Sequence, residues 1–150
     1  MDGRIINIRQ LGARPLEDGV KIDNRVYFHT AMRNFITRKR FVTRIFLPAG
    51  HYCTSPVNFY NPTNRYIALK LYGAGMNNTF LMPYEDGQEY ILKVGTSVSA
   101  TNCSRCSEVH DISFQCGNAE MSEDIAELYG DNKSLTRTAL LMYGTYYDCV

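Results

Sequence analysis

The chain has 150 residues and a mass of 17.1 kDa, the size of a single domain, so its length alone excludes no globular fold. Its content of 45% hydrophobic and 21% charged residues excludes a largely disordered chain. The 16 Lys and Arg residues nearly balance the 15 Asp and Glu residues, so the chain has no excess of positive charge that would favour binding to nucleic acid. The sequence also contains no run of about 18 apolar residues, the length that a membrane-spanning helix needs.

Residues 1–43 are predicted to form an N-terminal unit of one short strand and one helix. Residues 4–8 (RIINI) are rich in β-branched side chains, which favours a strand. The sequence Gly-Ala-Arg-Pro at 12–15 is typical of a break, and we expect a loop after it.

An amphipathic helix is predicted from Arg25 to about Lys39, where apolar residues recur at three- and four-residue spacing. Asp23 or Asn24 precedes it and can accept hydrogen bonds from the amides of its first turn. The basic residues 38–40 suit the solvated end of a helix. The residues expected to face the core are Val26, Phe28, Ala31, Met32, Phe35 and Ile36.

After the helix, short β-rich runs alternate with turns rich in Gly, Pro and Asn. The predicted strands are residues 44–47, 66–71, 79–82, 90–94, 112–116 and 138–143. No convincing helix separates them, and Asp86-Gly87 is the one candidate hairpin turn, so an antiparallel meander is weakly supported. Ile112, Phe114 and Cys116 alternate as inward-facing residues do. From this pattern alone, a β-sandwich and a solenoid both remain open.

Four segments occur in an informative order. They are residues 5–13 (IINIRQLGA), the stretch from Asp18-Gly19 to Asp23-Asn24, residues 45–52 (IFLPAGHY) and residues 71–81 (LYGAGMNNTFL). Together they resemble the start of the pectate-lyase-like superfamily, and residues 109–118 (VHDISFQCGN) look like a further repeat of the same type. The resemblance implies an all-β solenoid, with residues 44–150 forming the first rungs of a right-handed parallel β-helix behind an N-terminal amphipathic capping helix.

The predicted helix suits the end of a solenoid. An open solenoid exposes apolar core at its end, and a helix with one apolar and one basic face can cover it. Gly50, Gly73 and Gly75 are expected at sharp turns that need positive φ or close approach between rungs. The last residues, ALLMYGTYYDCV, look like the start of another rung, so we expect the β-helix to continue beyond residue 150.

The superfamily contains secreted polysaccharide lyases and hydrolases as well as trimeric bacteriophage tailspikes. The sequence starts with no signal peptide and has five cysteines, which favours a virion protein assembled in the reducing host cytoplasm. We therefore expect a structural N-terminal part of a phage tailspike or tail appendage. It would be a homotrimer in the virion tail, attached to other tail or baseplate proteins, with bacterial surface polysaccharide bound by later rungs.

The alternative is the first coils of a polysaccharide lyase or glycoside hydrolase. Whether the full-length protein degrades polysaccharide stays open, but this segment is predicted to be non-catalytic, because no pair of carboxylates can be assigned from the sequence. The acidic cluster of Glu120, Glu123, Asp124 and Glu127 is interpreted as a solvated loop. The tyrosines, including Tyr60 and Tyr72, suit either strand packing or a sugar-stacking surface.

A zinc site is a minor alternative. Cys103, Cys106, His110 and Cys116 could supply a tetrahedral set of ligands. Cys116 lies on the inward-facing run, however, so buried or loop thiols are favoured, and we expect neither a metal nor a cofactor.

Overall fold

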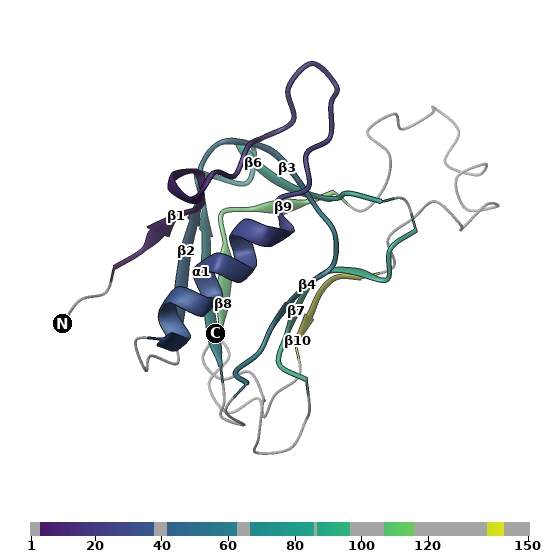
Figure 1. Cartoon of the computed structure of the whole chain (residues 1–150). Coiled ribbons are helices and arrows are strands. Elements are labelled where there is room, and N and C mark those ends of the chain that lie inside the picture. The colour runs from purple at the N-terminus through teal and green to yellow at the C-terminus, as the bar shows by residue number, and fades with distance from the viewer. Residues whose placement is uncertain are drawn as a thin grey trace.

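The computed structural model describes residues 4–37, 42–62, 67–85, 87–96, 107–115 and 138–142. This part of the chain is mostly β-strand with one α-helix, and every pair of strands is parallel (Figure 1). The predicted β fold with parallel strands is therefore confirmed, and an antiparallel sandwich is excluded for these residues. No helix in this part is long and apolar enough to span a membrane.

The N-terminal strand is shorter than predicted because the chain turns at Ile8. Strand β1 covers Ile6–Asn7, and the 3₁₀ helix η1 follows at Ile8–Leu11. The Asn7 side chain accepts a hydrogen bond from the Arg9 amide at 3.0 Å, and Gly12 ends η1 with a φ of 112°. Only a residue that tolerates positive φ closes such a turn easily, which is the role of the glycine.

The strands form three parallel sheets, and each sheet is named here by its strands. The first sheet has the order β1-β2-β5-β8, with β2 at Val42–Leu47, β5 at Ala68–Gly73 and β8 at Glu108–His110. The second has the order β3-β6-β9, with β3 at Gly50–Thr54, β6 at Thr79–Pro83 and β9 at Ser113–Phe114. The third has the order β4-β7-β10, with β4 at Val57–Phe59, β7 at Tyr90–Val94 and β10 at Thr138–Met142.

The chain visits these sheets in a fixed order. After β2, β3 and β4 it returns to the first sheet with β5, and then repeats the order with β6 and β7. In register, Ile45 pairs with Leu71, and Leu71 pairs with Val109. In each sheet, every new strand is therefore added to the same edge.

Three of the observed strands, β3, β4 and β8, were not predicted from the sequence. Strand β3 begins three residues after β2 ends, and β4 and β8 have only 3 residues each. A strand this short has no room for a visible alternation. Strand β2 also begins at Val42, two residues before the predicted strand and before the predicted domain limit at residue 44, whereas β7 has the predicted bounds.

The core is built from side chains that are stacked in register. Ile45 and Leu71 are fully buried in the first sheet, and Tyr52 and Leu81 are fully buried neighbours in the second. Residues of all three sheets belong to one hydrophobic cluster. Val57 and Leu92, paired in the third sheet, complete it.

Helix α1 at Arg25–Thr37 buries most of the face that the sequence predicted. Phe28, Ala31, Met32 and Phe35 are buried. The prediction is wrong for Val26, which is 55% exposed. At about 100° per residue, Val26 projects from the side of the helix opposite Phe28 and Phe35. The side chain of Ile36 and the basic residues 38–40 lie outside the described residues.

Helix α1 packs against β2, β4 and η1, the elements formed on the chain's first pass through the sheets. The rings of Phe28 and Phe59 meet edge to face, with their centroids 6.2 Å apart. Figure 1 shows α1 lying between the sheet that contains β2 and the sheet that contains β4. The helix thus covers apolar side chains of the first strands.

The turns between the first and second sheets are bonded to one another. The Gly50 amide donates to the Asn78 carbonyl at 2.8 Å, and the Gly75 amide donates to the Asp111 carbonyl at 3.1 Å. Gly50 and Gly75 have φ values of +140° and +122°, whereas at Gly73 a Cβ atom would overlap the Asp111 carbonyl. The three glycines therefore occupy positions where positive φ or close approach excludes a side chain.

Candidate functional site

The segment that leads into α1 is fixed by Asn24, which is completely buried. Its side-chain amide donates to the carbonyls of Arg14, Ile22 and Cys53 at 2.9, 3.1 and 3.0 Å. Its side-chain oxygen accepts from the Arg14 amide at 2.9 Å. Asn24 therefore joins the loop before the helix to β3, and its side chain is not used to cap the helix as the sequence suggested.

Asp23 accepts the hydrogen bond from the first turn instead. One carboxylate oxygen accepts from the amides of Arg25 and Ser55 at 3.0 and 2.9 Å, and the other accepts from the Ser55 hydroxyl at 2.6 Å. Burial alone would raise the pKa of Asp23, but these bonds and the charge of Arg25 together lower it below its usual value. The carboxylate is thus held ionised at the start of the helix.

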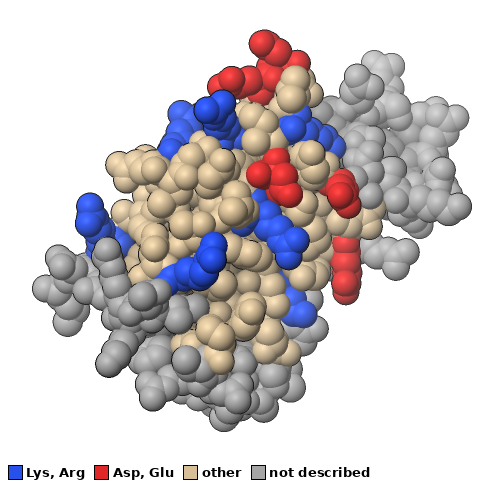
Figure 2. Space-filling view, in the orientation of Figure 1, with Lys and Arg blue, Asp and Glu red and all other residues tan. Residues whose placement is uncertain are grey.

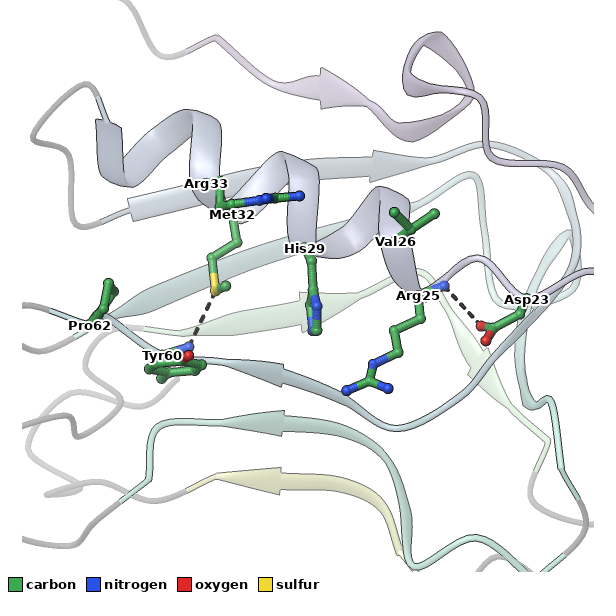
Figure 3. Close-up of a pocket in the computed structure, with 8 residues that line it drawn as sticks. All are labelled: Asp23, Arg25, Val26, His29, Met32, Arg33, Tyr60 and Pro62. Carbon is green, nitrogen blue, oxygen red and sulfur yellow. Dashed lines mark hydrogen bonds between the residues drawn. The ribbon is translucent and has the colours of Figure 1, made fainter.

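A pocket of about 680 Å³ opens beside these residues, between α1 and the end of β4 (Figure 3). We call it the cap pocket. Its lining residues are Asp23, Arg25, Val26, His29, Met32, Arg33, Tyr60 and Pro62. Figure 3 shows Arg25, His29 and Met32 pointing from the helix toward β4, with Tyr60 across from them. The pocket therefore combines cationic, aromatic and apolar groups.

His29 lies at the middle of the helical wall. Its Nε2 atom is buried and has no hydrogen-bond partner among the residues that the structure describes. Burial lowers the pKa of His29, and the positive charges of Arg25 and Arg33 lower it further, against a smaller opposing effect of Asp23. The imidazole is consequently neutral at pH 7.

Tyr60 forms the opposite wall. Its amide donates to the sulfur of Met32 at 3.4 Å, which ties the end of β4 to the helix. The side chain is 39% exposed. An aromatic ring held at a pocket wall and open on one side can stack on a flat or ring-shaped ligand.

A second group of polar and aromatic residues lies in register on β5 and β8. Lys70 forms an ion pair with Glu108, and the Tyr72 hydroxyl donates to Glu108 at 3.4 Å. The hydrogen bond from Lys70 is the main cause that lowers the pKa of Glu108. The Tyr72 and His110 rings are 4.4 Å apart, and His110 Nδ1 lies 2.7 Å from an Asp111 carboxylate oxygen. These contacts join the neighbouring strands β5 and β8. The carboxylates of Glu108 and Asp111 are paired with Lys70 and His110.

The same stacking occurs across β3 and β6. The rings of His51 and Phe80, which are partners in register, are parallel and 4.3 Å apart. Side chains that project away from the core thus form ladders along the sheets, a common means of fixing strand register.

Of the residues considered for zinc, only His110 lies in the described part, where it pairs with Asp111. Cys103, Cys106 and Cys116 lie outside it, as does the acidic cluster of Glu120, Glu123, Asp124 and Glu127. Within the ranges that the structure describes, no three His, Cys, Asp or Glu residues are grouped to hold a metal. Cys53 is a buried thiol whose pKa burial raises.

The sequence analysis missed the cap pocket although one signal was present. Arg25, His29 and Arg33 recur every four residues in the predicted helix, which places them along one stripe. Nothing in the sequence brings Tyr60 and Pro62 to that stripe, because their approach depends on how α1 packs on β4.

Charge is distributed without a single dominant sign on the face that carries α1. Figure 2 shows Lys and Arg side chains scattered over this face and acidic side chains nearer its upper and right-hand parts. The view agrees with the balanced composition. A ligand of the cap pocket would accordingly be attracted by local groups rather than by the field of the whole molecule.

What the chain does must be inferred from its own topology and side chains. Searches against protein-family models, curated proteins and solved structures gave no significant match to this chain.

Proposed function

We propose that these residues form the first rungs of a right-handed parallel β-helix, in the structural N-terminal part of a bacteriophage tailspike or tail appendage protein. One observation supports the β-helix in this proposal, whereas the assignment to a phage tail rests on the sequence resemblance. The chain enters three parallel sheets in a repeating order, and α1 packs on strands of the first pass. A solenoid requires this order, because each rung contacts only the rungs before and after it.

The distribution of buried residues supports the same architecture. Apolar residues from all three sheets share one cluster, to which Phe28 and Met32 of the helix also belong. A helix that buries one face against the first strands would protect the apolar end of a solenoid from water. In this proposal, α1 is the cap and the strands from β2 onward are the rungs.

The proposed role of this segment is mechanical. It would begin the β-helix, contribute to a homotrimer and attach the protein to other tail or baseplate components of the virion. Later rungs would bind bacterial surface polysaccharide. Glu108 joins β8 to β5 through Lys70, and Asp23 joins the start of α1 to Ser55, which suits a structural role for these acids.

The full-length polypeptide that contains this chain provides the test. We expect light scattering to give a mass of three chains, and immobilised polysaccharide from the bacterial surface to retain the protein. A monomer that shortens polysaccharide would instead support the alternative, a polysaccharide lyase or glycoside hydrolase. Cleavage by the 150-residue chain alone would contradict the structural role.

A further inference from the structure

We propose that the cap pocket binds a short acidic saccharide, with a sugar carboxylate at Arg25 and a sugar ring against Tyr60. The proposed function is the reason for choosing a saccharide, but the site itself follows from the side chains around the pocket. It is separate from the later rungs to which polysaccharide binding was assigned above.

The size and lining of the pocket suit such a ligand. A volume of about 680 Å³ lies within the range of small-molecule sites. Arg25, His29 and Arg33 lie at successive four-residue steps along one wall, so the stripe extends over roughly 12 Å at about 1.5 Å per residue. A ligand two or three sugar rings long matches this length.

Arg25 gives the pocket its preference for an anion. Its side chain points across the pocket toward β4 in Figure 3. Asp23, the acid in the described lining, interacts with the charge of Arg25, but its carboxylate accepts its hydrogen bonds from two amides and one hydroxyl rather than from the guanidinium. A guanidinium can bind a carboxylate through two parallel hydrogen bonds, so a carboxylate on the ligand is the natural partner.

His29 and Tyr60 favour a sugar over a simple anion. Among the described residues, the buried Nε2 of His29 has no partner, and a neutral imidazole that turns about its last side-chain bond can offer either nitrogen to a hydroxyl group. The partly exposed Tyr60 ring faces this wall and can pack on the apolar face of a pyranose. Met32 and Val26 add apolar contact beside it.

The inference can be tested by isothermal titration calorimetry of the full chain with tri-galacturonic acid at low salt. We expect binding to the unaltered protein and none of comparable strength with maltotriose, a neutral trisaccharide. Arg25→Gln should weaken binding by about tenfold, since it removes a charge-assisted pair. Arg14→Gln is the matched control: Arg14 is exposed, carries the same charge and is not among the pocket residues, so binding should be unchanged.

Three results would overturn the inference. They are the absence of heat with tri-galacturonic acid, equal weakening by Arg14→Gln and Arg25→Gln, and equally tight binding of tetraglutamate, which would show that any flexible polyanion suffices. Circular dichroism of each variant checks that it is folded. The outcome is independent of the proposed function: the full-length protein can bind polysaccharide without this site, and this site can bind the trisaccharide without a role in a tail.

Discussion

At Gly73 the backbone leaves no room for a side chain. Its φ is not in the left-handed region, so conformational freedom is not the reason for glycine at this position. The reason is the carbonyl of Asp111 on the next pass of the chain, which a Cβ atom at residue 73 would overlap. The close packing of these two successive turns therefore requires a residue without a side chain at position 73.

Gly73→Ala should destabilise the fold by about 3 kcal/mol, because the clash involves rigid backbone. Gly19→Ala is the control. Gly19 has a φ of +75° but nothing within 4 Å of an added Cβ, so only the conformational cost of about 1 kcal/mol applies. Denaturant unfolding of both variants measures the difference. A smaller loss at Gly73 than at Gly19 would show that the turns can move apart freely.

At the scale of elements, the sequence predicted α1 and most of its buried face. Its apolar spacing identified four buried residues and its start at Arg25. The error at Val26 has a geometric cause, since hydrophobic character alone does not say which side of a first turn meets the core. The short strands β3, β4 and β8 were missed for a different reason: pairing with neighbours, rather than local pattern, makes them strands.

Phe28→Ala tests how firmly the helix is held. The ring is fully buried against Phe59, so we expect a loss of about 3 to 5 kcal/mol in the free energy of unfolding. Val26→Ala, in the same helix but 55% exposed, should change stability by no more than about 0.5 kcal/mol. Thermal and denaturant unfolding provide the readout, and equal effects of the two substitutions would contradict the packing of α1 on β4.

For the molecule as a whole, the buried titratable groups predict that the free energy of unfolding decreases at both acidic and alkaline pH. The pKa of His29 is lowered in the folded state, so the unfolded chain takes up its proton first as pH falls through the ordinary value of 6.5. Stability then declines. The pKa of Asp23 is also lowered in the folded state, so the unfolded carboxylate is protonated first and the contribution of Asp23 is lost as pH falls below 3.8. On the alkaline side, burial raises the pKa values of Cys53 and Tyr52, so stability declines as pH rises through 9.0 and then 10.0.

Urea unfolding from pH 3 to pH 10.5 checks this profile. His29→Gln has no titrating ring, so it should flatten the decline that begins as pH falls through 6.5 and leave the alkaline side unchanged. An unaltered acid slope in this variant would mean that other groups cause it.

The sequence predicted the whole fold only in part, and the limits are physical. Alternating apolar residues identified β7 and most of β5 and β6, and the absence of crossover helices indicated β structure. The cap pocket could not be predicted, because Tyr60 meets His29 only through tertiary packing. The buried polar residue Asn24 was placed at the right position but with the wrong partners, since Arg14 and Cys53 are remote in sequence.

Each sheet gains its strands at one edge in chain order, and this order allows the chain to fold during its synthesis. In each sheet the neighbours of a strand are those of the preceding and following passes, so the earliest strands need nothing from the latest ones to find their partners. A ribosome releases residues in that same order, and domains generally fold from the N-terminal side during synthesis. Helix α1 and the strands it contacts can therefore assemble while the rest is still being translated, and each completed pass offers the nascent chain a ready template.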